Sequence, residues 1–188
     1  MIQFPRLEII TGAMFTGKSN ELISRLNKYK YLLPKREIYL FKSEMHNYID
    51  SNTIKSHDGL VKECIDIKNA NSIWKVLSKK NVSKNPIIGI DEAQFIEGLY
   101  SYTVNYLLPE LKAFVIISGL SRDSEGNSFG DLPYLLAAAD YITTLSGICS
   151  TCGLEATQTQ YLGETKTQVC IDTGENYTIR CNKCWERK

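Results

Sequence analysis

The hydrophobic positions of this chain form short apolar runs that alternate with longer amphipathic segments. Runs of four or five apolar residues between polar or turn residues are typical of strands buried on both faces of a parallel sheet. Segments with apolar residues three and four positions apart are typical of helices that pack on such a sheet. The alternation of the two predicts an α/β fold with a mainly parallel sheet and helices on both faces.

The same pattern gives approximate bounds for these elements. Strands are predicted at residues 7–10, 37–41, 87–90, 113–117 and 141–145, and helices at 19–33, 71–79, 99–108 and 132–139. Pro34 and Pro109 end two of the helices, because proline cannot continue a helix. The polar stretches 42–59 and 119–130 have no clear period and are predicted to be loops beside a functional site.

The pattern changes near Gly147. Beyond it the helical period disappears, and turn residues with short runs rich in threonine and tyrosine take over. We therefore expect an α/β domain of residues 1–147 and a small domain of residues 148–188. A segment this short buries little core and needs a cross-link such as a metal ion.

Four of the six cysteines provide such a cross-link. Each Cys-x2-Cys pair can chelate from one tight turn, and four thiolates make a closed tetrahedral zinc site. The N-terminus shows no secretion signal and no apolar run is long enough to span a membrane, so we expect a cytoplasmic protein with zinc rather than disulfides. Cys64 and Cys170 are expected to be ordinary thiols. The predicted zinc ligands are Cys149, Cys152, Cys181 and Cys184.

The residues between the first strand and the first helix fit the phosphate-binding loop G-x-x-x-x-G-K-[ST]. Two glycines let consecutive backbone N–H groups point at an anion at the start of a helix. Lys18 would then reach the β- and γ-phosphates, and the Ser19 hydroxyl would ligate Mg²⁺. The residues predicted to bind ATP and Mg²⁺ are Gly12, Ala13, Met14, Phe15, Thr16, Gly17, Lys18 and Ser19.

A second acidic motif follows the strand at 87–90. Asp91 at the end of this strand can hold Mg²⁺ beside the phosphate loop. Strand alternation predicts that Glu92 faces the other way, where it could accept a proton from an attacking hydroxyl group. An acidic pair that only caps a turn is the alternative.

The charge balance limits the class of partner. The chain has 22 basic and 21 acidic residues, so its net charge is +1. This balance argues against a general electrostatic attachment to nucleic acid or to an anionic membrane.

Together these motifs resemble the type II thymidine kinases, the cytosolic cellular class. The resemblance covers essentially the whole chain and rests on the phosphate loop, on Asp91–Phe95, on Phe129-Gly130, and on the two cysteine pairs around a Gly-Glu-x-Tyr segment that ends at Tyr177. It implies a RecA-like ATP-binding domain at 1–147. It also implies a zinc-binding domain at 148–188 that carries a lasso loop over the nucleoside.

The family resemblance also implies a reaction. A thymidine kinase transfers the γ-phosphate of ATP to the 5′-hydroxyl of thymidine and gives thymidine monophosphate. ATP, Mg²⁺ and a structural Zn²⁺ are the implied cofactors, and thymidine is the implied substrate. A homotetramer and feedback inhibition by thymidine triphosphate (dTTP) go with the family, and neither a membrane nor nucleic acid is an expected partner.

Site residues follow from the matched positions. Glu92 is the implied general base, and Asp91, Glu92, Ala93 and Gln94 are implied to line the phosphate site. The residues implied to surround thymidine are Met14, Phe95, Leu120, Ser124, Phe129 and Tyr177, together with the lasso residues Gln168, Val169, Cys170, Ile171 and Asp172, which read the base through main-chain groups.

Three positions depart from the family pattern. The usual Asp-x-Arg falls on Met45–Asn47, the usual Gly-Leu-Asp becomes Gly119–Ser121, and the usual aromatic residue falls on Ser124, beside Glu125. A looser substrate pocket, or compensation by Arg122, follows from these changes. The alternatives are therefore a kinase for another deoxynucleoside such as deoxyuridine, and a catalytically weak zinc-containing nucleotide-binding protein.

Overall fold

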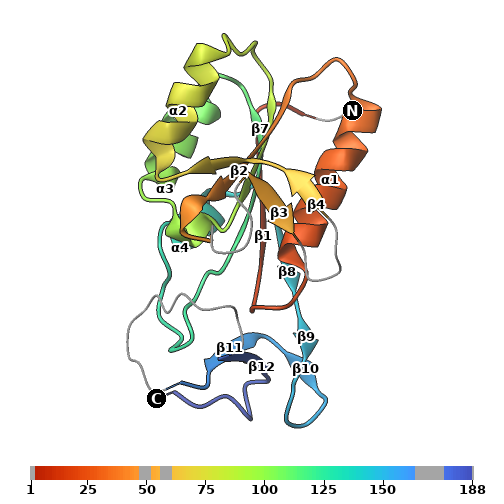
Figure 1. The fold of residues 1–188 in the computed structure, drawn as a ribbon, viewed down its shortest axis with the longest axis vertical. Helices are drawn as coiled ribbons and strands as arrows, with labels where there is room; N and C mark the ends of the chain where they lie inside the picture. Colours follow the sequence, from red (N-terminus) through yellow and green to blue (C-terminus); the bar gives the residue numbers. More distant parts are fainter. Residues whose placement is uncertain (1–2, 47–51, 56–60, 164–175, 188) are drawn as a thin grey trace.

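The computed structural model describes residues 3–46, 52–55, 61–163 and 176–187. Its centre is a six-stranded sheet in the order β5-β2-β6-β7-β1-β8 (Figure 1). Every neighbouring pair in this sheet is parallel, as the sequence pattern predicted. The strands are β1 (Arg6–Gly12), β2 (Ile38–Ser43), β5 (Ile65–Ile67), β6 (Ile87–Asp91), β7 (Phe114–Gly119) and β8 (Tyr141–Leu145).

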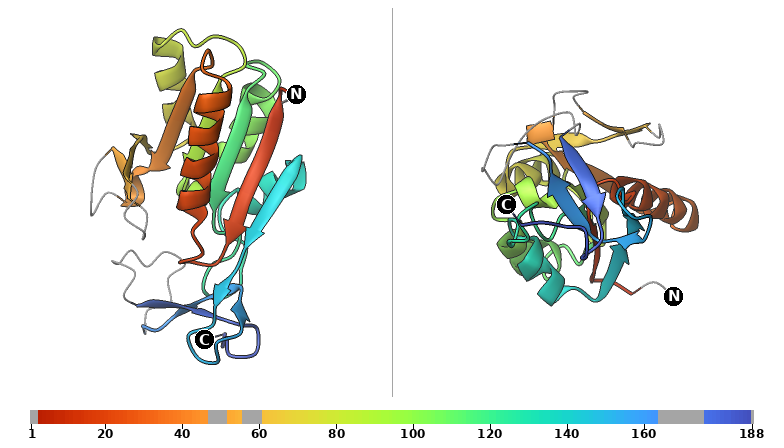
Figure 2. Two further views of the ribbon diagram at one scale, coloured as in Figure 1. Left: turned by 90° about the vertical axis from the view of Figure 1, so that its right-hand side faces the viewer. Right: turned by 90° about the horizontal axis from the view of Figure 1, so that it is seen from below.

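Helices cover both faces of the sheet. Helix α1 (Lys18–Leu32) lies on one face (Figure 2). The other face carries α2 (Ala70–Lys79), α3 (Leu99–Tyr102), the π-helix η3 (Thr103–Leu107) that continues α3, and α4 (Leu132–Ala138).

Residue alternation along β1 explains how one strand serves two cores. Ile10 belongs to the buried cluster of Leu22 and Leu26 on the α1 face. Leu7 and Ile9 belong to the cluster on the other face, together with residues of α2, α3 and α4. Successive strand residues point to opposite faces, so a strand covered on both faces is mostly apolar. The acidic residue within this strand, Glu8, is buried and paired with Arg25 of α1.

The polar stretch 42–59, which is predicted to be a loop, contains short elements. The 3₁₀ turn η1 (Glu44–His46) follows β2, and β3 (Thr53–Lys55) pairs antiparallel with β4 (Val61–Glu63). The edge strand β5 is a further element that the sequence pattern does not predict. It has only three residues, held by parallel pairing with Phe41–Ser43, so periodicity had too little length to reveal it.

Four short strands form a separate small module at one end of the molecule (Figure 1). Strand β9 (Gly147–Ile148) pairs with β10 (Glu155–Ala156), and β11 (Gln158–Tyr161) pairs with β12 (Tyr177–Arg180), both antiparallel. The buried cluster of this module is Cys149, Ala156 and Cys181. Such a core is too small to stabilise the module alone.

Within the described part of the chain, no helix combines the length and apolar character that crossing a membrane requires.

Candidate functional site

The phosphate loop connects β1 to α1 through a backbone path that requires glycine. A Cβ atom on Gly12 would lie 2.4 Å from the carbonyl oxygen of Leu145 in β8. Gly17 has φ 80° and is the N-cap of α1. The loop therefore delivers Lys18 and Ser19 to the first turn of the helix, as a phosphate-binding loop does.

Lys18 points into the site. Its side chain is buried and its Nζ donates a hydrogen bond to the Ala13 carbonyl at 2.6 Å. Burial lowers the pKa of Lys18, and the negative charges of Glu92 and Asp91 act in the opposite direction. Both carboxylates are thus close enough to Lys18 for their charges to act on it, as the predicted phosphate site requires.

Asp91 is buried at the carboxyl end of β6. It accepts a hydrogen bond from Ser118 Oγ at 2.5 Å, and the Ser19 side chain also bonds to it. Burial and then the Glu92 charge raise the pKa of Asp91, whereas the bonds from Ser118 and Ser19 lower it. Asp91 and Ser19 are hard oxygen ligands of the kind that Mg²⁺ prefers, and they lie next to the phosphate loop.

Glu92 does not continue the strand. It has φ 52°, in the left-handed region, and is the N-cap of the 3₁₀ turn η2 (Ala93–Phe95). Strand alternation, on which the expectation that Glu92 faces away from Asp91 rests, ends at Asp91, so that direction stays a prediction. The charges of both residues act on Lys18. Gln94 Nε2 donates to Glu92 Oε2 at 2.6 Å. A non-glycine residue in this region of φ is a frequent feature of functional sites.

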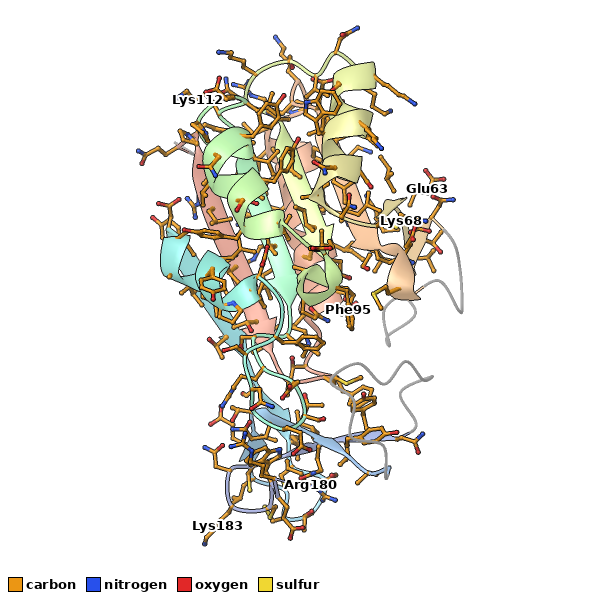
Figure 3. All side chains as sticks on the ribbon, turned by 90° about the vertical axis from the view of Figure 1, so that its left-hand side faces the viewer. Glu63, Lys68, Phe95, Lys112, Arg180 and Lys183 are labelled. Carbon is orange, nitrogen blue, oxygen red and sulfur yellow. The ribbon has the colours of Figure 1, made fainter. Side chains whose placement is uncertain are left out.

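An aromatic pair lies beside the acidic residues. The rings of Phe95 and Phe129 meet edge to face with centroids 5.3 Å apart. In Figure 3, Phe95 lies at the end of the sheet that faces the small module, and Arg180 and Lys183 belong to that module. Leu120, at the end of β7, is also buried. The N–H of Leu120 bonds to Gln94 in η2, and Phe129 contacts Phe95 of the same turn, so these three predicted nucleoside contacts lie on segments that meet at η2.

Three of the remaining predicted substrate residues, Met14, Ser124 and Tyr177, lie in the described part of the chain. Ser124 accepts a hydrogen bond at its carbonyl from Trp185 Nε1, and Tyr177 begins β12 with its ring 4.9 Å from that of Tyr161. Met14 donates its backbone N–H to Thr159 Oγ1 at 3.0 Å. The lasso residues 168–172 lie outside the described residues, so their predicted role stays a prediction.

The four predicted zinc ligands lie close together in the small module. Their sulfur atoms all lie within 4.8 Å of one another, and Cys152 Sγ and Cys181 Sγ are 3.6 Å apart. Zn–S bonds of about 2.3 Å in a tetrahedron put sulfur atoms about 3.8 Å apart, so the four thiols fit zinc. Desolvation raises the pKa of Cys149, yet backbone hydrogen bonds outweigh it and lower the value to about 6. The pKa of Cys181 is also lowered, whereas the pKa values of Cys152 and Cys184 are raised, so two of the four thiols favour the thiolate that binds metal and two do not.

Cys64 is separate from this cluster. It is buried beside β5, and burial raises the pKa of its thiol to about 12. This agrees with the expectation of an ordinary thiol.

Three residues that contact the site were not found from the sequence. Ser118 could have been suspected, since it lies near the carboxyl end of the strand adjacent to Asp91. Thr159 and Trp185 carry no signal in the sequence, because their roles depend on how the small module packs on the loops.

Comparison with known proteins places this chain beside thymidine kinases. The family model described as "Thymidine kinase" matches residues 5–185. A thymidine kinase from Coprothermobacter proteolyticus is 36% identical over 182 residues, which cover 94% of this chain and 88% of that protein.

Proposed function

The chain belongs to the thymidine kinase family, and from this premise we propose how its residues transfer the γ-phosphate of ATP to the 5′-hydroxyl of thymidine. One observation supports this assignment of roles: Lys18 lies within range of the charges of Asp91 and Glu92 at the carboxyl end of the sheet. Phosphoryl transfer needs a cationic cradle, a metal ligand and a proton acceptor at close quarters.

The cradle is the loop from Gly12 to Ser19. Its backbone N–H groups and Lys18 neutralise the negative charge that develops on the phosphate oxygens. Ser19 and Asp91 hold Mg²⁺, which supplies further charge neutralisation when it is bound. Ala93 and Gln94 line the same side of the site.

Glu92 is the proton acceptor. It follows the metal-binding Asp91 directly, and its left-handed backbone turns it out of the strand. A carboxylate within reach of the 5′-hydroxyl takes its proton as the phosphoryl group arrives.

The nucleoside lies between the sheet and the small module. Phe95, Phe129, Leu120 and Met14 form its pocket on the sheet side, and Tyr177, Ser124 and the lasso 168–172 approach it from the other elements. Closure of the lasso excludes water and so limits hydrolysis of ATP.

Several finer features are part of the same proposal. Zn²⁺ on the four cysteines holds a distinct domain at 148–188, and the enzyme works as a cytoplasmic homotetramer. Feedback inhibition by dTTP is expected because its base and its phosphates fit the nucleoside pocket and the phosphate loop at once. The exposed Tyr141 and Ile142 on edge strand β8 support contact between subunits.

Substitution of Glu92 tests the central role. Glu92→Gln keeps the size of the side chain but cannot accept the proton, so thymidine phosphorylation should fall by about 100-fold or more. Transfer from labelled ATP measures the rate, and equilibrium titration measures ATP affinity, which should change little. Phosphorylation at the normal rate would refute the assignment of the base.

A nucleoside panel separates the alternatives. Thymidine and deoxyuridine are offered to the native enzyme under the same conditions. Preference for thymidine supports the proposal, whereas preference for deoxyuridine identifies the second kinase activity. Nucleotide binding with no transfer to either nucleoside identifies a protein that only binds nucleotide.

A further inference from the structure

The side-chain amide of Gln94 makes hydrogen bonds through both its nitrogen and its oxygen. The residue is only 5% exposed and lies in η2. Its Nε2 donates to Glu92 Oε2 at 2.6 Å, and its Oε1 accepts from the backbone N–H of Leu120 at 2.9 Å. One side chain thus joins the proposed base to Leu120 of the proposed nucleoside pocket.

The orientation of this amide is determined by its partners. A backbone N–H can only donate, so the oxygen of Gln94 must face Leu120. The NH₂ group must then face Glu92, whose carboxylate oxygen is the acceptor. A hydrogen bond to a carboxylate is stronger than one between neutral groups, so the bond from Gln94 restrains the Glu92 side chain.

Two glycines make the space that Gln94 occupies. A Cβ atom on Gly119 would lie 2.6 Å from Gln94 Oε1, and one on Gly130 would lie 2.2 Å from the Gln94 carbonyl oxygen. Gly130 also has φ 54°. The backbone of β7 and the backbone after Phe129 therefore enclose Gln94 closely, and any other residue at either position would displace it.

We propose that Gln94 is a positioning residue, whose amide fixes the Glu92 carboxylate against the Leu120 backbone so that the base faces the nucleoside pocket in one geometry. The inference rests on the proposed function, in which Glu92 accepts the proton. It differs from the sequence expectation that Gln94 lines the phosphate site as an ATP ligand. A misplaced base slows the chemical step while ground-state binding remains, and loss of an ATP ligand weakens ATP binding.

Two variants separate these roles. Gln94→Met is similar in length and makes neither bond. Gln94→Glu keeps an acceptor for the Leu120 N–H but presents an oxygen instead of a donor to Glu92. We expect kcat to fall by about 100-fold in both variants, with KM for thymidine changed by less than about threefold. A buried second carboxylate beside Glu92 should lower the thermal midpoint of Gln94→Glu, so ATP affinity is measured for both variants at a temperature at which each is folded. Slow turnover with native ATP affinity cannot be attributed to failure to fold.

A double-mutant cycle gives the decisive readout. If Gln94 acts through Glu92, Gln94→Met should cause no further loss of kcat in the Glu92→Gln background. A further loss equal to that in the native background would show a purely structural role. An increase in the KM for ATP with unchanged kcat in Gln94→Met would show an ATP ligand. Either result overturns the inference, whereas full activity of Glu92→Gln alone would refute the proposed base instead.

Discussion

A single methyl group at Gly130 should disturb the site more than the same change at Gly98. Gly130→Ala places an alanine at φ 54° and puts its Cβ against the Gln94 carbonyl oxygen. The left-handed backbone alone costs about 1 to 2 kcal/mol, and displacement of Gln94 adds to it. We expect a loss of stability greater than that cost in urea unfolding, and a lower kcat with thymidine.

Gly98→Ala is the matched control. Gly98 also has positive φ, at 75°, but the nearest atom to its added Cβ is 3.9 Å away. It should show the backbone cost with kcat unchanged. Equal losses of stability in the two variants would mean that the contact with Gln94 carries no energy.

The identities of the reactive residues could be predicted from the sequence, but their orientations could not. Lys18, Asp91 and Glu92 belong to short motifs with fixed spacing, and the structure brings them together. The direction of Glu92 cannot be predicted from strand alternation, because alternation does not describe a residue in the left-handed region. The bond from Gln94 to Leu120 depends on tertiary contact between β7 and η2, which no local pattern records.

At the scale of elements, Arg25 connects α1 to the sheet and so supports the start of the helix at Lys18. Its NH1 pairs with the buried Glu8 of β1 at 2.8 Å, and its NH2 donates to Thr143 Oγ1 of β8 at 2.7 Å. Arg25→Met should lower the free energy of unfolding by about 2 kcal/mol, since Glu8 keeps Arg6 as a partner but loses one buried bond. Urea unfolding measures the change.

Glu21 provides the comparison for this pair. It contacts Arg25 Nε at 2.7 Å one helical turn away, and its side chain is far more exposed than that of Glu8. Glu21→Gln should cost only about 0.5 kcal/mol, as exposed pairs in helices do. A cost as large as that of Arg25→Met would place the stabilisation on the helix surface rather than at the sheet.

Long elements were predictable and short ones were not. Four of the five predicted strands lie inside the sheet and supply buried apolar residues to its cores, whereas β8 is a largely exposed edge strand. Strands β3, β4 and β5 have three residues each and form only through pairing with neighbours. The helix predicted at 99–108 is helical, but its second half is a π-helix, a change of hydrogen bonding that side-chain spacing does not reveal.

At the scale of the molecule, the small module contacts both loops of the site. Thr159 Oγ1 accepts from the Met14 N–H in the phosphate loop. Trp185 Nε1 donates to the carbonyls of Ser124 and Thr159, and its ring is the nearest group to Gly126. Motif order in the sequence indicated the family, yet these contacts could not be predicted, because they join segments far apart in the chain.

Removal of zinc should therefore abolish transfer while the sheet stays folded. Among the described residues, the fully buried apolar cluster of the small module is Cys149, Ala156 and Cys181, so without metal the module should unfold and release the loops at Met14 and Ser124. We expect Cys181→Ser, or treatment with a strong chelator, to eliminate thymidine phosphorylation. Far-ultraviolet circular dichroism should keep the helical signal of α1 and α2.

Trp185 reports this loss directly. Trp74, which is exposed on α2, is the other tryptophan, so a Trp74→Phe background leaves Trp185 as the single emitter. Its emission should shift to longer wavelength when the metal leaves, and the shift should be reversed when Zn²⁺ is added back. Cys64→Ser removes a buried thiol outside the cluster and should leave both emission and activity intact. Full activity of the metal-free protein would show that the module can hold the phosphate loop without zinc, and the structural role of the four cysteines would then be wrong.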